Sequence, residues 1–403
     1  MMQSSWSGAN AIEPRFDMPE SARERRLDIR FTGSGSEYFR IWIVNLLLTI
    51  VTLSLYHPWA KVRRLRYFHG NTLVDGHALD FHGDPKKMLR GYLFVALLAL
   101  IYSVATRFSP VAGLVAFGIM AVIWPMLFKA SMQFKLANTS WRGLRFRFKG
   151  DVAGAYKAML PLFVPGLLFL FVVAWGDKPP SQDVSESLGF AALAVIGASV
   201  LLVPLLLWNL KKYQHGNYAL GQVQTRLQAS RGSFYAVFFK TIGVSILAGI
   251  ALSIVLGVVM AAGFAGVLTL GSTGGKPNVA VIIAGIALGF LLMVGMQLIP
   301  RPYFESRMQN LLWGRTAGDH LRFKSELRFA PLLWLTLKNW FLMVVTLGLY
   351  WPFAKVALAR IRLQAVAVLS TLSIDQLHDH VRLAGGDAAG DAAGDFFGID
   401  IGL

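Results

Sequence analysis

Residues 45–66 read NLLLTIVTLSLYHPWAKVRRLR, and residues 339–360 repeat much of this stretch as NWFLMVVTLGLYWPFAKVALAR. At one fixed offset both segments carry the same asparagine, Thr-Leu, Leu-Tyr, proline, Ala-Lys-Val and arginine. Each segment is an apolar run followed by a turn-like Tyr-x-Pro and a basic stretch. Such a run, ending in aromatic and basic residues, is typical of a chain that reaches a membrane surface. We therefore expect two copies of one membrane-associated element.

The composition places the whole chain in the membrane class. Of its 403 residues, 55% are hydrophobic and 15% are charged, whereas a soluble domain has about 25% charged residues. Several apolar runs approach the roughly 20 residues of a membrane-spanning helix. The chain has no cysteine, which excludes disulfides, thiolate metal sites and cysteine nucleophiles.

The formal net charge of +17 points to an acidic partner. Basic surfaces can bind nucleic acid, but Lys and Arg also collect in the cytoplasmic loops of membrane proteins, where they contact anionic headgroups. The second explanation fits so apolar a chain better. We expect membrane lipids with anionic headgroups as partners, and no nucleic acid.

Three segments differ in composition. Residues 1–26 are polar and arginine-rich, and they predict a disordered basic N-terminal arm. Residues 27–372 form the predicted membrane domain of repeated units, which opens with the strand-like alternation of Leu27, Ile29 and Phe31. Residues 373–403 are rich in Gly, Ala and Asp, and they predict a disordered tail.

A hairpin signal recurs between the apolar runs. Asp75-Gly76 joins two short alternating runs, and Asp-Gly is the strongest short-range signal for a β-hairpin. Shifted as a block, several positions from Pro58 to Asp84 match positions from Pro125 to Asp151. Weaker copies follow later prolines. We therefore predict about five related units, each with an apolar part, an exit proline, a basic helix and a hairpin.

Three units contain paired apolar spans, at residues 91–107 with 110–128, 158–176 with 187–210, and 236–270 with 278–300. The links inside the pairs hold few cations, whereas the loops between pairs are rich in Lys and Arg. By the positive-inside rule those basic loops are cytoplasmic, and both termini should lie on the same side.

This orientation creates a conflict for the two matching elements. If residues 41–58 and 333–351 each crossed once, the arginine-rich N-terminal arm and Lys355 would lie outside. We therefore favour six full spans plus two re-entrant or interfacial elements, with eight simple spans as the alternative. The predicted fold class is an all-α polytopic membrane protein with about six to eight transmembrane or re-entrant helices and short cytoplasmic β-hairpins, which pair at most into a small sheet.

Polar residues inside the apolar runs are candidates for a solute path. Burying such groups is unfavourable unless they are paired, so they should face protein or water. Corresponding broken helices in two halves are also how many transporters build substrate sites. The candidate path comprises Asn45, Thr49, Thr52, Asn339 and Thr346. The alternative is that these side chains cap helices or bond across them.

The basic stretch beyond each proline is a candidate contact for anionic lipid. An aromatic anchor at headgroup depth with cations just beyond it is expected of an interfacial helix. The candidates are Trp59, Lys61, Arg63, Arg64, Arg66, Lys355 and Arg360. Passive anchoring and a specific lipid or phosphate site both fit this pattern.

No pattern for catalysis or metal binding emerges. The Gly-rich stretch at residues 271–277 lacks the spacing of a phosphate-binding loop and has proline where its metal-binding Ser/Thr belongs. His77 and His82 match no zinc-site spacing, and no nucleophile elbow or kinase motif is present. We expect no enzyme, no cofactor and no metal site.

Several short sequence segments resemble those of the YjgN-like family of bacterial inner-membrane proteins, which is classed as a domain of unknown function. They include Phe31-Thr-Gly33, Glu37-Tyr-Phe-Arg-Ile-Trp42, Thr52-Leu-Ser-Leu-Tyr56, Pro58-Trp-Ala-Lys61 and Asn71-Thr72. The resemblance implies an integral protein of the bacterial cytoplasmic (inner) membrane, and it supplies no reaction or ligand. As function we predict a transporter or channel-like protein for a small polar or anionic solute. The alternative is a non-transporting protein that binds lipid or organises the envelope.

Overall fold

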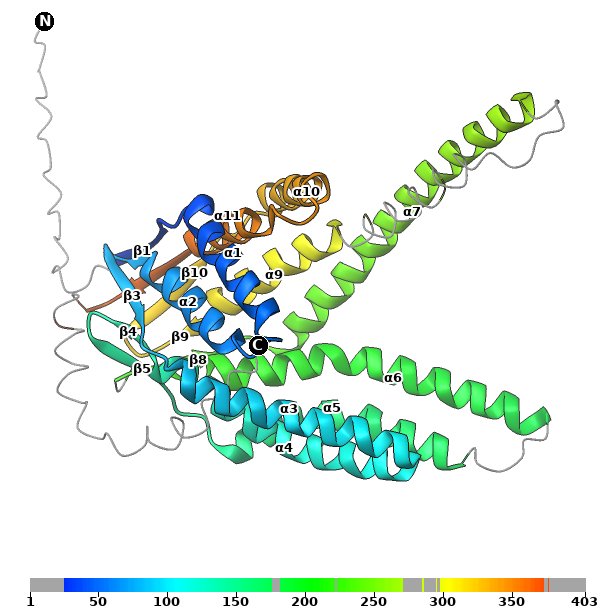
Figure 1. Ribbon diagram of the computed structural model, residues 1–403, viewed down its shortest axis with the longest axis horizontal. Helices are drawn as coiled ribbons and strands as arrows, with labels where there is room; N and C mark the ends of the chain where they lie inside the picture. Colours follow the sequence, from blue (N-terminus) through cyan, green and yellow to red (C-terminus); the bar gives the residue numbers. More distant parts are fainter. Residues whose placement is uncertain are drawn as a thin grey trace, which may run out of the picture.

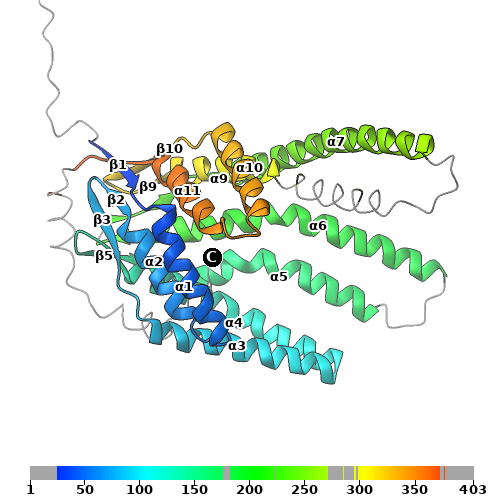
Figure 2. The ribbon, with the colours of Figure 1, turned by 45° about the horizontal axis from the view of Figure 1, so that its top comes forward.

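The computed structural model describes residues 25–175, 182–221, 223–270 and 298–372, together with residues 285, 295 and 376. Among these residues the strands gather at one end of the molecule, and long helices extend away from it (Figure 1 and Figure 2). The strands are β1 (Arg25–Phe31), β2 (Thr72–Val74), β3 (His77–Phe81), β4 (Thr139–Trp141), β5 (Leu144–Phe148), β6 (Tyr218–Leu220), β7 (Val223–Gln224), β8 (Arg226–Leu227), β9 (Thr316–Ala317), β10 (Leu321–Ser325) and β11 (Val366–Ser370).

All eleven of these strands belong to one sheet. Its order is β7-β6-β5-β4-β3-β2-β1-β11-β10-β9-β8, and every neighbouring pair is antiparallel. The first and last strands, β1 and β11, pair near the middle of this order, with Arg25 opposite Ser370. The edge strands β7 and β8 are separated in the chain by Thr225 alone. The two edges of the sheet are therefore joined through this one residue, and the sheet curves into a nearly closed ring, which we call the closed sheet.

One face of the closed sheet buries a common apolar core. Its fully buried members come from strands all along the sheet order, and burial of this kind of surface is the main favourable term in folding. Partly buried side chains such as Ile29, Val74 and Phe323 pack against it. The buried members are Leu27, Trp141, Leu220, Val223, Leu321 and Val368.

Two of the strand connections have the predicted two-residue turns. Val74 pairs with His77 across Asp75-Gly76, where φ is 49° and 79°. Arg142-Gly143 repeats this geometry between β4 and β5, with φ of 50° and 79°. Positive φ at both central residues marks a type I′ turn, which favours glycine at the second position. The hairpin predicted at Asp75-Gly76 is confirmed.

Between strands the chain forms pairs of helices that leave the sheet and return to it. The pairs are α1 (Gly35–Val51) with α2 (His57–Gly70), α3 (Pro85–Phe108) with α4 (Pro110–Ala137), α5 (Val152–Trp175) with α6 (Gln182–His215), α7 (Arg231–Leu270) with α9 (Pro300–Gly314), and α10 (Phe329–Val345) with α11 (Trp351–Gln364). We call α1–α2 and α10–α11 the short helical hairpins, and α3–α4 and α5–α6 the long helical hairpins.

The long helices supply the segments suited to crossing a membrane. Four stretches among the described residues are long and apolar enough: Pro85–Phe108, Val111–Ala137, Ala192–His215 and Arg231–Val255. Most of their side chains are exposed in the protein alone, as expected for helices whose solvent is lipid. Phe329–Val345 is apolar but shorter. The chain is thus suited to membrane insertion.

We call the second helix of each pair its return helix. Three return helices are joined to the strand that follows them by the same side-chain hydrogen bonds. The Nδ2 atoms of Asn71, Asn138 and Asn217 donate to the carbonyl oxygen four residues earlier, at 2.8, 2.9 and 2.8 Å. The hydroxyls of Thr72 and Thr139 donate to carbonyls in the same relation, at 2.7 and 2.8 Å. The carbonyls of Tyr67 and Phe134 also accept from the backbone N–H of the same asparagine, at 3.1 and 3.2 Å, so the side-chain bond adds a second donor at the end of each helix. The side-chain bonds fix the direction in which each strand leaves its helix.

The predicted all-α fold class, in which short cytoplasmic hairpins pair at most into a small sheet, is wrong. The hairpins join edge to edge into one sheet of eleven strands that collects residues from both ends of the described chain. A single two-stranded hairpin is marginally stable in water, whereas several strands sharing a buried face are stable together. The hairpins therefore form the common platform from which the described helical pairs extend.

Several predicted segments lie outside the described residues. They are residues 1–24 of the N-terminal arm, the link at 271–277, nearly all of the predicted span at 278–300, and the tail at 373–403 apart from residue 376. Residues 25 and 26 belong to β1, although the sequence predicts them in the disordered arm. The predicted counts of six or eight spans stay predictions.

Candidate anion-binding surface

The short helical hairpins turn back at the repeated Thr-Leu-x-Leu-Tyr. In the first, Thr52 Oγ1 donates to the Leu48 carbonyl at 2.7 Å and accepts from the Tyr56 backbone N–H at 3.0 Å. Thr346 makes the same pair of bonds in the second hairpin, at 2.6 and 3.0 Å. The two threonines therefore hold the turns, because their hydroxyl groups bridge the end of one helix to the start of the next.

These turns use left-handed backbone conformations at matching positions. Leu53 and Ser54 have φ of 47° and 70°, and Leu347 and Gly348 have φ of 49° and 90°. Only glycine adopts this region without a steric cost. The turn side chains Leu53 and Leu347 are also 89% and 93% exposed. Each short hairpin thus presents an apolar tip that water solvates poorly and lipid solvates well.

The two repeated asparagines occupy equivalent buried positions. Asn45 on α1 and Asn339 on α10 are both 7% exposed, and the Oδ1 atom of each lacks a hydrogen-bond partner. Both α1 and α10 pack against α11 (Figure 2). Thr49 donates its hydroxyl to the Asn45 carbonyl at 2.7 Å. The structure brings Thr49 to Asn45 and Thr346 to the second turn, and neither asparagine Oδ1 accepts a hydrogen bond from the other asparagine in the part of the chain that the structure describes.

The predicted lipid-contact residues on α2 lie beside the first turn. Tyr56 and Trp59 stack with ring centroids 6.1 Å apart, and the Arg63 guanidinium lies 5.8 Å from the Tyr56 ring. Arg66 is further along α2, where its guanidinium donates to the Gly83 carbonyl at 3.5 Å. Lys61, on the same helix, also makes a contact. Aromatic rings and cations therefore follow the apolar tip in the expected order.

On α11 the equivalent cations are held differently. The Lys355 ammonium lies 5.3 Å from the Trp351 ring, and Arg360 donates to the Gly33 carbonyl at 2.8 Å. Burial, with a further contribution from the nearby Arg64, lowers the pKa of Lys355. Cations of α2 and α11 thus gather on the same side of the molecule, close enough to repel one another.

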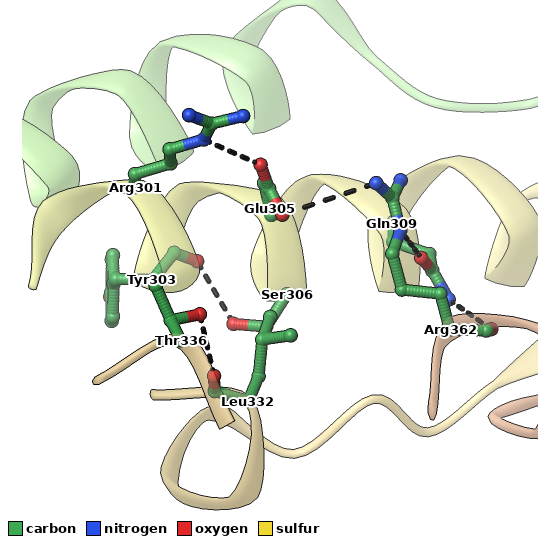
Figure 3. Close-up of polar contacts among 8 residues, drawn as sticks. All are labelled: Arg301, Tyr303, Glu305, Ser306, Gln309, Leu332, Thr336 and Arg362. Carbon is green, nitrogen blue, oxygen red and sulfur yellow. Dashed lines mark hydrogen bonds and ion pairs between the residues drawn. The ribbon is translucent and has the colours of Figure 1, made fainter. Parts of the chain in front are cut away.

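Around α9 a carboxylate relieves the repulsion between two of the cations. Figure 3 shows Glu305 between Arg301, at 3.0 Å, and Arg362, at 3.9 Å. Gln309 joins the group, accepting from Arg362 at 2.9 Å. In contrast, Arg63 makes no ion pair with a carboxylate among the described residues.

A hollow with a volume of about 520 Å³ opens between α1 and α2. Three of its lining residues are arginines, and their neighbours are apolar or aromatic. We call it the α1–α2 hollow. Its lining residues are Arg40, Ile41, Val44, Arg63, Arg66 and Tyr67.

Two of these arginines, Arg63 and Arg66, are among the residues predicted from the sequence, and Arg40 is not. Arg40 lies on α1, in the apolar element rather than the basic one. The sequence signal that points to it is spacing: Arg40 and Val44 are four residues apart and therefore share one helix face. This face approaches the arginines of α2 because α1 folds back onto α2.

A second hollow, with a volume of about 720 Å³, lies where α5, α6, β8 and α7 meet. Four cationic side chains line it, and none of them was among the candidates from the sequence. We call it the α5–α7 hollow. Its cations are Lys157, Lys212, Arg226 and Arg231.

Groups of acidic and histidine side chains do not form a metal site in the described residues, where no cluster of three such groups is present. His82 contacts the Ser140 hydroxyl, 2.8 Å from its Nε2 atom. His77 lies 2.9 Å from the Asp75 carbonyl through its Nδ1 atom.

Comparison with known proteins gives a family and relatives in the inner membrane. A family model described as "Bacterial protein of unknown function (DUF898)" matches residues 26–396. The inner membrane protein YjgN of Salmonella typhimurium is 25% identical over 347 residues, which cover 81% of this chain and 84% of that protein. Its namesake from Escherichia coli K12 is 27% identical over 172 residues, covering 41% of this chain and 43% of that protein. No solved structure matches.

Proposed function

Because the chain belongs to the DUF898 family of bacterial proteins of unknown function, and because relatives are named inner membrane proteins, we propose that it is an inner-membrane protein that binds anionic phospholipid headgroups. The observation that carries the proposal is the α1–α2 hollow, in which Arg40, Arg63 and Arg66 line one opening. Guanidinium groups bind phosphate through paired N–H donors.

The surroundings of the hollow match a position at headgroup depth. An exposed apolar tip that includes Leu53 lies at one end of the helical hairpin, and the sheet lies at the other. The stacked Tyr56 and Trp59 rings stand between the tip and Arg63. Aromatic rings favour the membrane interface, and arginines beyond them meet the phosphates. Ile41 and Val44 offer the adjoining apolar wall for the upper part of an acyl chain.

The topology we propose places the sheet and both ends of the described chain in the cytoplasm. Each described helical pair starts and finishes at this sheet, and the basic loops of the chain lie at that end. The long helical hairpins then cross and return, while the short ones enter the lipid and turn back. The matching junction bonds of Asn71, Asn138 and Asn217 further support an origin from repeated units.

The transporter interpretation has less support. A solute path through Asn45 and Asn339 requires polar space between them, and α11 packs against both of their helices. The hydroxyls of Thr49 and Thr346 donate to helix carbonyls of Asn45 and Leu342. Neither asparagine lines the α1–α2 or the α5–α7 hollow. Lipid binding needs only groups that the structure already brings together.

The test is lipid retention by the purified full-length protein. Native mass spectrometry in mild detergent would compare phosphatidylglycerol with phosphatidylcholine. We expect the wild type to retain phosphatidylglycerol preferentially and the triple variant Arg40→Gln, Arg63→Gln, Arg66→Gln to lose most of that preference.

A matched control removes the same charge from the exposed sheet surface: Arg30→Gln, Arg145→Gln, Lys149→Gln. We expect this variant to retain phosphatidylglycerol as the wild type does. Equal loss in both variants would mean that net charge alone attracts the lipid, and the assignment to the α1–α2 hollow would then fail.

A further inference from the structure

The α5–α7 hollow collects cations from four separate elements. Lys157 extends from the first turns of α5, Lys212 from the end of α6, Arg226 from β8 and Arg231 from the start of α7. They are distant in sequence, so only the fold brings them together. The hollow shares no lining residue with the α1–α2 hollow.

A buried tryptophan holds two of these cations in place. Trp208 is 9% exposed, and its indole N–H donates to the Ala229 carbonyl at 2.9 Å. The Lys212 ammonium lies 4.7 Å from its ring centroid, and the Arg231 guanidinium lies 4.6 Å from the same ring. Both distances are within cation–π range. Two charged groups of one sign are thus fixed around a rigid ring before any ligand arrives, which lowers the entropy that a ligand must overcome.

The carboxylate that lines the hollow is already engaged. Asp151 Oδ1 accepts from the Gly154 N–H at 3.1 Å, as a cap at the start of α5. The Asp151 backbone carbonyl accepts from the Tyr213 hydroxyl at 2.8 Å. Lys157, Lys212, Arg226 and Arg231 make no ion pair with a carboxylate within the described residues. The lining therefore carries four positive charges against one negative charge, and this excess favours an anion.

We propose that the α5–α7 hollow binds a phosphomonoester group. Such a group carries about two negative charges at neutral pH and three strong acceptor oxygens, which suits several cations better than the single charge of a phosphodiester. Arginine supplies forked donors, and lysine supplies compact charges. The apolar contribution of Trp208, Ala158 and Leu227 to the lining leaves room for the organic part of the molecule.

Two sources can deliver this group to the hollow. Trp208 and Lys212 lie at the sheet-side end of Ala192–His215, and Arg231 begins Arg231–Val255, both of which are long enough to cross a membrane. The hollow therefore lies near headgroup depth, where phosphatidic acid presents a phosphomonoester. A soluble phosphorylated molecule can reach the same place from the sheet side. The site goes beyond the headgroup contact proposed at α1–α2 and can exist without it.

The experiment uses full-length protein in nanodiscs and in detergent. Native mass spectrometry measures retention of phosphatidic acid against phosphatidylglycerol, and calorimetric titration measures binding of glycerol 3-phosphate. We expect a preference for phosphatidic acid, binding of glycerol 3-phosphate, or both. The first result alone identifies a lipid source, and the second identifies a soluble one.

The double variant Lys212→Gln, Arg231→Gln should lower the affinity for the phosphomonoester at least tenfold. If this variant does not fold, Lys157→Glu replaces it, because Lys157 is exposed and its reversal brings a second carboxylate to the hollow. The control Arg40→Gln, Arg63→Gln should leave phosphomonoester binding unchanged even where it abolishes phosphatidylglycerol retention. Equal binding of phosphatidic acid and phosphatidylglycerol together with no binding of glycerol 3-phosphate would overturn the proposal. Unchanged phosphomonoester binding in the variants would also overturn it.

Discussion

The short hairpin α1–α2 and the long hairpin α3–α4 leave the same sheet and return to it, yet they differ in how deep they can go. α1 has 17 residues and α3 has 24, or about 26 Å and about 36 Å of helix. The hydrocarbon core is about 30 Å thick. The return helices differ more, because α2 has 14 residues and carries Lys61, Arg63, Arg64 and Arg66, whereas α4 has 28 and is apolar for most of its length.

We propose that the return helix decides whether a pair crosses. Cations in the middle of a membrane-spanning helix are expensive, and α2 carries them within about three turns of its tip. An apolar α1 alone would look like a span. The same holds for α10, which is apolar and followed by the basic α11.

The largest effect is expected when α4 is given the charges of α2. Ile119 and Val122 face outward in the middle of Val111–Ala137. Ile119→Arg with Val122→Arg should oppose insertion by about 3 kcal/mol for each charge. External labelling of a cysteine at residue 108 would then fall steeply. Unchanged labelling would break the comparison, and Ile119→Val with Val122→Ile provides the matched control.

A smaller effect, on stability, should distinguish Asn→Leu substitutions at the buried asparagines of the two kinds of hairpin. Asn138, at the end of α4, is buried and donates to the Phe134 carbonyl at 2.9 Å. Asn138→Leu should therefore destabilise the protein by about 1–3 kcal/mol, as for a lost buried hydrogen bond. Asn45→Leu removes a buried acceptor that lacks a partner and should be neutral or stabilising.

Thermal unfolding in detergent measures both variants. If Asn45→Leu destabilises the protein as much as Asn138→Leu does, then Asn45 holds a bound water or solute. That outcome would revive the solute path.

Local sequence predicted the parts of this fold whose causes are local. Asp75-Gly76 predicted a hairpin because both residues of that turn need positive φ. The pairing of Arg25 with Ser370 joins the two ends of the described chain, and nothing near either residue indicates the other. The alternation of Leu27, Ile29 and Phe31 predicted a strand but not its partners. The closed sheet therefore could not be predicted from the units that compose it.

The candidate site divides in the same way. Arg63 and Arg66 follow Trp59 closely, so a linear pattern of aromatic and basic residues identified them. Arg40 joins them only because α1 folds back onto α2. Arg226 and Arg231 meet Lys157 only because the closed sheet brings β8 and the start of α7 to α5. The repeat predicted that Asn45 and Asn339 are equivalent, and their equal burial agrees, but equivalence did not determine whether they meet.

Substitutions to or from glycine in the turns of the short hairpins should change the free energy of unfolding by about 1 kcal/mol. Ser54 has φ of 70°, and Gly348 stands at its position in the second copy with φ of 90°. Ser54→Gly should stabilise the protein, and Gly348→Ala should destabilise it, by about 1 kcal/mol each. A Cβ at Gly348 meets no atom within 4 Å, so sterics with neighbours do not contribute. Thermal unfolding with no change in either variant would mean that the chain does not turn there.

The smallest effect is a pH dependence at the contact between the two kinds of hairpin. His69, near the end of α2, has its Nε2 atom 3.5 Å from the Thr139 hydroxyl at the start of β4. Burial lowers the pKa of His69, so the folded protein disfavours its protonation. The unfolded chain takes up the proton as pH falls below about 6.5, and stability decreases with it.

The contribution of the buried, neutral His69 to the free energy of unfolding is therefore fully present above about pH 6.5 and is lost as the pH falls below this value. His69→Gln should reduce the difference in melting temperature between pH 7.5 and pH 5.5. An unchanged difference would show that His69 is not buried in the folded state.

Cysteine labelling in intact cells tests the central claim most directly, because the chain has no native cysteine. Single cysteines would replace Phe108 at the tip of the long hairpin, Ser54 at the tip of the short one, and His77 on the sheet. With a membrane-impermeant thiol reagent, we expect labelling at residue 108, none at residue 54, and labelling at residue 77 only after the cells are permeabilised. Labelling of residue 54 from outside would show that the short hairpin crosses the membrane, and it would contradict the account.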